Sequence, residues 1–228
     1  MGVLISGIEP GSPAARAGIQ PGQILERIDG QTIQDVLDYR FYMTNTAPTL
    51  ELADPQGAQR RVTVKKGEYE DLGLMFDTYL MDKQRSCRNR CVFCFIDQLP
   101  KGLRQSLYFK DDDARMSFLF GNYVTLTNLT QREIERILTM HISPVNISVH
   151  TTDPDLRVKM MGNPRAGEVL RWLPQLAEGG IRLNTQLVLC PGLNDGKALD
   201  RSLADLSALA PHMQSIAVVP VGLTAHRE

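Results

Sequence analysis

Three of the four cysteines in this chain of 228 residues lie within one short segment. Cys87, Cys91 and Cys94 have the spacing Cys-x3-Cys-x2-Cys inside residues 86–95. Thiols this close together cannot all pair as disulfides, and a tight loop brings their three soft sulfur donors to one centre. The spacing therefore predicts a metal or cluster site around which the rest of the chain is organised.

The number of ligands separates the candidate metals. Structural zinc is usually held by four protein ligands, often as two Cys-x2-Cys or Cys/His pairs. No second pair is present, and Cys190 and the four histidines lie far from the loop in sequence. Three thiolates with an open fourth position suit an iron–sulfur cluster that binds a further ligand on one iron. A structural zinc site, or a cluster that only transfers electrons, is the alternative.

The cysteine loop resembles that of the radical S-adenosylmethionine (radical SAM) superfamily. In that superfamily the three cysteines bind a 4Fe-4S cluster, and the amino and carboxylate groups of SAM bind the fourth iron. The resemblance implies that Cys87, Cys91 and Cys94 are the metal ligands. It also implies that Phe93, the aromatic residue just before the last cysteine, lies beside the adenine of SAM.

The segments that flank the loop, residues 80–85 and 95–104, resemble a narrower group of bacterial proteins. Those proteins, described as Fe-S oxidoreductases, join an N-terminal PDZ-like domain, a radical SAM domain and an uncharacterised C-terminal domain. The resemblance covers essentially all of this chain. We expect the chain to stop before the C-terminal domain of that group.

Composition indicates an ordinary folded protein, with 43% hydrophobic and 22% charged residues. The formal net charge of -1 gives no global reason to expect binding to nucleic acid or to an anionic membrane. No apolar run approaches the roughly 20 residues of a membrane-spanning helix, and no secretory signal is evident. Clustered free thiols favour a reducing compartment, so we expect a cytoplasmic location.

Residues 1–67 have the pattern of a small β-rich domain. The runs at residues 10–18 (Pro-Gly-Ser-Pro-Ala-Ala-x-Ala-Gly) and 21–30 (Pro-Gly-x-Ile-Leu-x-x-Ile-Asp-Gly) resemble the PDZ domains of bacterial proteases. PDZ domains bind extended peptides by adding a strand to a sheet edge, so a peptide or protein partner is one hypothesis. A docking or regulatory module is the other. Residues 72–76 (Leu-Gly-Leu-Met-Phe) look like a carboxylate-binding loop but are interpreted as the start of the next domain.

Residues 72–228 alternate between expected strands and helices, which predicts a parallel sheet with right-handed crossovers. Thr130 and Glu133 form a sequence capping box in front of the helix expected over residues 131–140. About five β/α units can be counted. Together with the resemblance, they predict an α/β fold, a partial TIM-type barrel that is incomplete at its C-terminal end. Residues 117–126 are interpreted as a helix end, a turn and a strand. Further strands are expected over 145–150, 181–189 and 215–221, and the other helices over 153–161, 166–178 and 199–209.

In β/α barrels the chemistry lies at the carboxyl ends of the strands. Thr127 and Asn128 fall where the resembled superfamily has a Gly-Gly-Glu motif that receives the amino group of SAM, although the glutamate is absent here. We expect this contact to come from Thr127, Asn128 or backbone carbonyls.

Two further strands end in polar residues that share one face, because side chains repeat every second position. These pairs are Ser148 with His150 and Asn184 with Gln186. Polar side chains pointing into a barrel need polar partners, so a cavity with a polar ligand explains them. Asn184 and Gln186 are assigned to the ribose or carboxylate of SAM, and His150 either to the cofactor or to a structural role.

The pattern predicts a radical SAM enzyme that cleaves SAM reductively and acts on an unknown substrate. An external electron donor is required, and no general base or nucleophile is expected because radical formation needs neither. The alternative is a PDZ adaptor without enzymatic activity, whose cysteine loop holds zinc or a redox cluster.

Overall fold

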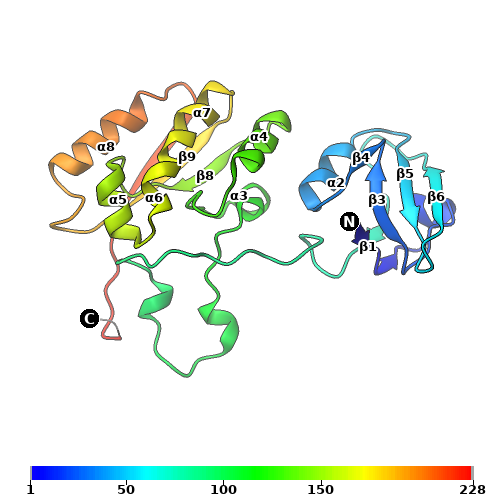
Figure 1. Cartoon of the computed structure of the whole chain (residues 1–228), viewed down its shortest axis with the longest axis horizontal. Helices are drawn as coiled ribbons and strands as arrows, with labels where there is room; N and C mark the ends of the chain where they lie inside the picture. The colour runs from blue at the N-terminus through cyan, green and yellow to red at the C-terminus, as the bar shows by residue number, and fades with distance from the viewer. Residues whose placement is uncertain (1, 227–228) are drawn as a thin grey trace. The chain divides into compact units, whose positions relative to one another are not determined.

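The computed structural model describes residues 2–226. Two compact units divide between Gln84 and Arg85, and they are described separately (Figure 1). Within the described part of the chain, no helix has the length and apolar character needed to cross a membrane.

The first unit is built on an antiparallel sheet with β1 (Val3–Leu4), β3 (Ile24–Ile28), β5 (Thr49–Ala53) and β6 (Gln59–Thr63) in that order. The short strand β4 (Gln31–Thr32) pairs with β3, and β2 (Gly7–Ile8) pairs with β7 (Leu74–Met75). The helices are α1 (Pro13–Arg16) and α2 (Val36–Tyr42). These elements agree with the small β-rich domain that the sequence predicts for residues 1–67.

Side-chain caps begin both helices of the first unit. Ser12 accepts a hydrogen bond from the Ala15 amide, and Asp35 accepts one from the Leu37 amide. Each cap satisfies one of the amides that a helix N-terminus leaves unpaired. The same helices close the core, because Ala14 and Tyr39 pack against the buried faces of the strands.

The segment from Leu72 to Met75 belongs to the first unit, which differs from the expected start of the second domain at residue 72. Leu72 and Leu74 are buried in the core of this unit. The Ala14 amide donates to the carbonyl oxygen of Leu72, and the Glu9 amide donates to that of Gly73. Strand β7 therefore completes the first unit through pairing with residues more than sixty positions earlier, which local sequence patterns do not reveal.

Shortening the Leu72 side chain tests this assignment. Leu72→Ala should lower the free energy of unfolding of the first unit by about 2–5 kcal/mol, because the side chain is fully buried and its removal leaves a cavity. Leu4→Ala in the same unit is the matched control, since Leu4 is 49% exposed. Chemical denaturation monitored by circular dichroism gives both values, and equal losses would contradict the assignment.

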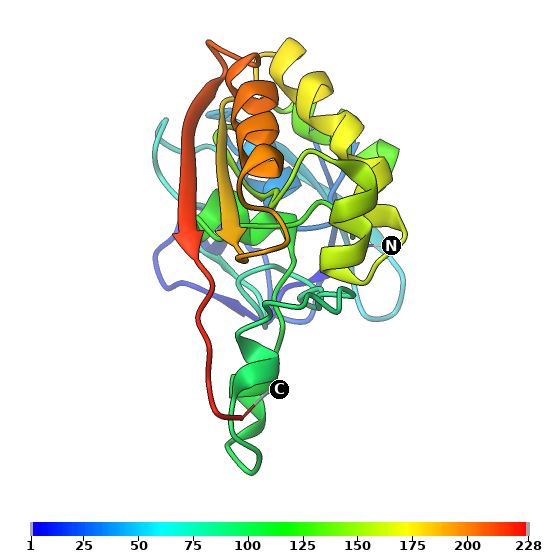
Figure 2. The ribbon, with the colours of Figure 1, turned by 90° about the vertical axis from the view of Figure 1, so that its left-hand side faces the viewer.

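The second unit has a parallel sheet in the order β8 (Val145–Ser148), β9 (Leu183–Leu189), β10 (Met213–Pro220). Its α-helices are α3 (Ala114–Phe120), α4 (Gln131–Thr139), α5 (Pro154–Met161), α6 (Arg165–Glu168), α7 (Trp172–Glu178) and α8 (Lys197–Ser207). Short 3-10 helices are η1 (Ile96–Gln98), η2 (Gln105–Tyr108) and η3 (Val169–Arg171). Figures 1 and 2 show α5 to α8 on one side of β9 and β10.

The parallel sheet is as predicted, but the described residues form no closed barrel. The strand expected within residues 117–126 is reduced to Val124, which forms an isolated parallel bridge with Ile147. The helix end and turn expected before this strand are confirmed, because α3 ends at Phe120 and Gly121 follows in a left-handed conformation. The capping box before α4 is confirmed, because Thr130 and Glu133 exchange the expected backbone hydrogen bonds.

Candidate functional site

The cysteine loop is docked on the C-terminal end of α5. The Arg90 amide donates to the Met161 carbonyl oxygen at 2.8 Å, and the Val92 amide donates to that of Met160 at 2.9 Å. These bonds satisfy carbonyl groups that the end of a helix leaves unpaired. Gly162 ends α5 in the left-handed region, and a Cβ placed there would lie 3.0 Å from the Arg90 carbonyl oxygen. The close approach of loop and helix therefore requires a glycine at this position.

The three loop cysteines line one pocket, which has a volume of about 430 Å³. The pocket also receives residues from the expected strand ends. The predicted site residues that line it are Cys87, Cys91, Phe93, Cys94, Ser148, His150 and Gln186. Polar groups at the end of β8 (Ser148 and His150) and within β9 (Gln186) thus line the same pocket as the cysteines.

The thiol of Cys91 is the most buried of the three. Burial is the main cause that raises the pKa of Cys91 to about 12, and the neighbouring Cys87 and Cys94 contribute to the same shift. Without a bound metal this side chain is therefore a neutral thiol at physiological pH. Metal binding has to displace its proton, as it does for thiolate ligands in general.

His150 has a fixed orientation at the edge of this pocket. Its backbone lies in the left-handed region with φ of 66°, and its Nδ1 accepts a hydrogen bond from the Val188 amide at 3.2 Å. Burial lowers the pKa of His150 to about 3, so the ring is neutral and its proton is on Nε2. The ring centroid lies 4.3 Å from that of Phe93.

Three of the predicted cofactor-binding residues do not line this pocket. The Thr127 hydroxyl donates to Asn89 Oδ1 at 3.1 Å, and Asn128 Nδ2 donates to the Ser86 carbonyl oxygen at 3.0 Å. The amide of Asn184 is held on both sides, because its Nδ2 donates to Asn146 Oδ1 and its Oδ1 accepts from the Ser215 hydroxyl. Their contacts with SAM stay predictions.

Asp112 is a site residue that the sequence analysis missed. A short run of charged residues such as 110–115 is usually solvated, but Asp112 is only 3% exposed, and Asp113 and Arg115 are buried with it. The Asp112 carboxylate accepts hydrogen bonds from the Thr125 amide at 2.7 Å and the Thr125 hydroxyl at 2.6 Å. Burial raises the pKa of Asp112 to about 6. No local pattern distinguishes this aspartate from its exposed counterparts elsewhere.

Arg157 is a second site residue that the sequence analysis missed, and its hydrogen bonds connect the ends of neighbouring strands. Its Nη2 donates to the carbonyl oxygens of Thr125 and Ser148, and its Nε donates to that of Val149. The side chain is 1% exposed, and burial lowers the pKa of Arg157 to about 10. It therefore keeps its charge at neutral pH and places a fixed positive charge close to Cys91.

The donor set fits an iron–sulfur cluster in its chemistry. It offers three soft sulfur ligands, a buried positive charge and amide donors to Cys87 Sγ. Within residues 2–226, no three His, Cys, Asp or Glu side chains form a preformed chelate for a single metal ion. The cluster assignment therefore rests on the loop spacing and the shared pocket. Arg85 pairs with Glu133 on the surface, while Arg88 and Arg90 do not line the pocket.

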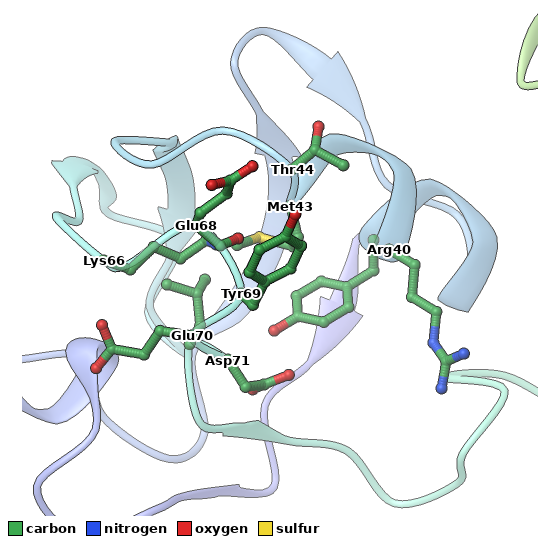
Figure 3. Close-up of a pocket in the computed structure, with 10 residues that line it drawn as sticks. Arg40, Met43, Thr44, Lys66, Glu68, Tyr69, Glu70 and Asp71 are labelled. Carbon is green, nitrogen blue, oxygen red and sulfur yellow. The ribbon is translucent and has the colours of Figure 1, made fainter.

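The first unit has a pocket of its own, between α2 and the segment that leads into β7 (Figure 3). Its volume is about 300 Å³, and three acidic side chains, Glu68, Glu70 and Asp71, contribute to its wall. Asp71 Oδ1 accepts a hydrogen bond from the Gly73 amide at 2.7 Å. The Gly73 amide of the Leu-Gly-Leu-Met-Phe segment is thus already paired with a carboxylate of the same chain.

The docking of the cysteine loop on α5 predicts how Cys91 reacts. In the metal-free protein Cys91 should be alkylated slowly by iodoacetamide at pH 8, because little of it is thiolate, and the rate should rise with pH. Gly162→Ala should increase the rate about 5- to 30-fold, since a loss of one or two kcal/mol of docking free energy has that effect. Peptide mass spectrometry follows the individual cysteines.

Gly121→Ala is the matched control for this experiment. Gly121 also ends a helix in the left-handed region, but a Cβ there would meet its nearest neighbour at 3.8 Å, an ordinary contact. Both variants place an alanine at positive φ, and only Gly162→Ala should expose Cys91. An equal rise in both variants would show that general destabilisation, and not loop docking, controls the thiol.

Comparison with known proteins agrees with both units. A family model described as "Radical SAM-like domain" matches residues 66–216, and a "PDZ domain" model matches residues 4–54. A "Probable GTP 3',8-cyclase" of Pyrobaculum aerophilum is 33% identical over 108 residues, which are 45% of this chain and 35% of that protein. A "Putative serine protease HhoB" of Synechocystis sp. is 36% identical over 76 residues, 32% of this chain and 18% of that protein.

A "Putative protease Do-like 14" of Arabidopsis thaliana is 46% identical over 39 residues, 17% of this chain and 9% of that protein. The chain thus spans about a third of the length of the cyclase relative and less of the two protease relatives. The radical SAM model, in contrast, matches more than half of the chain. This chain belongs to the radical SAM-like domain family and carries a PDZ domain ahead of its cysteine loop.

Proposed function

We propose that this chain is a radical SAM enzyme whose cluster is held by Cys87, Cys91 and Cys94. The observation that carries the proposal is the shared pocket, because polar groups from the end of β8 and from β9 line one cavity with the three cysteines. A loop that only transferred electrons would need no such cavity. The family match and the cyclase relative support the same reaction class.

The chemistry that a 4Fe-4S cluster and SAM supply when bound is a one-electron reductive cleavage of SAM, which yields methionine and a 5'-deoxyadenosyl radical for hydrogen abstraction from a substrate. The protein residues contribute binding, orientation and exclusion of water. Phe93 and His150 form an aromatic wall that suits the adenine ring. His150 Nε2–H is a fixed donor, and Gln186 adds a second polar group for ribose or carboxylate oxygens.

The substrate of this reaction is unknown, and an external protein or small molecule has to supply the electron. The wall of the pocket includes apolar side chains such as Val188 and Phe109. Arg157 and Asp112 do not act on the substrate in this proposal. They keep the strand ends in register behind the cysteines.

Anaerobic reconstitution tests the proposal. The chain should bind about four irons, and its electron paramagnetic resonance spectrum after reduction should change when SAM is added. Cys91→Ala should lose the cluster, because one of three ligands is missing. Cys190→Ala is the matched control and should keep it, since Cys190 is a buried thiol outside the pocket.

Two results would contradict the enzyme proposal. Zinc in place of iron, or a cluster spectrum that SAM does not change, would support the alternative of a PDZ adaptor with a structural or redox cysteine loop. Loss of the cluster from Cys190→Ala as well would show that the loop cysteines are not the specific ligands.

We also propose that the PDZ domain binds an extended peptide segment of a partner. The observation that favours this is the position of the Leu-Gly-Leu-Met-Phe segment, which enters β7 beside α2, with Phe76 packed edge-on against Tyr39. The Asp71 carboxylate competes with a peptide carboxylate for the Gly73 amide. The domain should therefore bind free C-termini weakly in its present form.

Removing that carboxylate should strengthen binding of a peptide C-terminus. Asp71→Ala frees the Gly73 amide, and we expect about a tenfold gain in affinity for a fluorescent polyalanine decapeptide that ends in Val with a free carboxylate, since a hydrogen bond to a charged group is worth about 1.5–3 kcal/mol. Glu68→Ala, in the same pocket, is the control for the change in charge. Fluorescence polarisation measures both, and an equal gain for the amidated peptide would contradict the competition.

A further inference from the structure

Asn89 lies between the first cysteine of the loop and the neighbouring strand end, and it is only 4% exposed. Its Nδ2 donates to Cys87 Sγ at 3.3 Å and to Thr125 Oγ1 at 2.9 Å. Its Oδ1 accepts from Thr127 Oγ1 at 3.1 Å and from Asn163 Nδ2 at 2.6 Å. An asparagine side chain has two donor hydrogens and two acceptor lone pairs, so all four are used.

The orientation of the Asn89 amide follows from its neighbours. Asn163 Oδ1 accepts from the Arg165 amide, which turns Asn163 Nδ2 toward Asn89. Asn89 must therefore present its oxygen to Asn163 and its nitrogen to Cys87. On the other side, the Thr125 hydroxyl donates to the Asp112 carboxylate at 2.6 Å, so it can only accept from Asn89.

The sulfur of Cys87 thus receives two N–H donors from one residue. The backbone amide of Asn89 also donates to it, at 3.4 Å. Hydrogen bonds to the cysteine sulfurs of an iron–sulfur cluster are among the factors that set its reduction potential, because they stabilise the more negative, reduced state. The side-chain donor is held by buried partners and cannot turn away.

We infer that Asn89 is a positioning residue that raises the reduction potential of the cluster through the Cys87 sulfur. The inference rests on the proposed function, in which Cys87 is a cluster ligand. Asn89 does not line the pocket, so its effect is on the ease with which the cluster accepts an electron and not on contact with the substrate. No comparison and no sequence motif assigned it a role.

Asn89→Leu removes the side-chain donor with little change in volume. After anaerobic reconstitution without SAM, the midpoint potential of its cluster should be more negative than that of the unaltered chain. We expect the equilibrium constant for reduction to fall about tenfold, which is about 59 mV for a one-electron couple. A redox titration followed by electron paramagnetic resonance measures it.

Asn146→Leu is the matched control. Asn146 is also a buried asparagine of the second unit, with Asn184 as its side-chain partner, and it contacts no cysteine. Its loss should destabilise the fold without moving the midpoint potential. A shift of equal size in Asn146→Leu would mean that loosening of the fold causes the change, and the inference would be overturned.

A second variant keeps the test decisive if Asn89→Leu does not bind iron. Thr127→Val removes one donor to Asn89 Oδ1, so the amide is held less firmly and the midpoint potential should move in the same direction by a smaller amount. The inference would be overturned if Thr127→Val bound a normal cluster with an unchanged midpoint potential and Asn89→Leu either had an unchanged potential or gave none that could be measured. Failure of the unaltered chain to bind a cluster would instead contradict the proposed function.

Discussion

The candidate site depends on one buried guanidinium. Arg157 is buried and donates hydrogen bonds to carbonyl oxygens from two adjacent strand ends and from Ala166 in α6. A charge in the interior is costly unless every donor has a partner, so the surrounding backbone can adopt few other arrangements. Because Arg157 is part of α5, its side chain connects the edge of the sheet to the helix on which the cysteine loop is docked.

A buried carboxylate, that of Asp112, accompanies the buried guanidinium of Arg157. Asp112 and Arg157 influence each other electrostatically, yet each satisfies its hydrogen bonds with other groups. Asp112 fixes Thr125, and Thr125 in turn fixes Asn89 beside Cys87. Polar networks of this kind are stable in a low-dielectric interior only when every member is paired. Rigidity behind the cysteines is therefore a consequence of polar burial as well as of apolar packing.

Features that depend on neighbouring residues could be predicted from the sequence. The cysteine spacing, the capping box at Thr130 and the alternation of strands and helices are local, and all are present in the structure. Features that depend on distant partners could not. Leu74 pairs with Ile8, and the Asn184 side-chain amide donates to Asn146 Oδ1. The sequence predicted that Asn184 and Gln186 share one face of β9, but the hydrogen-bond partners of Asn184 come from β8 and β10.

The same distinction explains why the loop alone does not define a site. The ten residues that contain Cys87, Cys91 and Cys94 supply the proposed ligands and Asn89, but other segments hold these residues in place. Helix α5 receives the loop amides, Gly162 allows the approach, and Thr127 and Asn163 turn the Asn89 amide toward sulfur. Thiol burial, which disfavours the thiolate, comes from the same packing. A cysteine motif therefore becomes a centre of defined affinity and potential only after the sheet and α5 have formed around it.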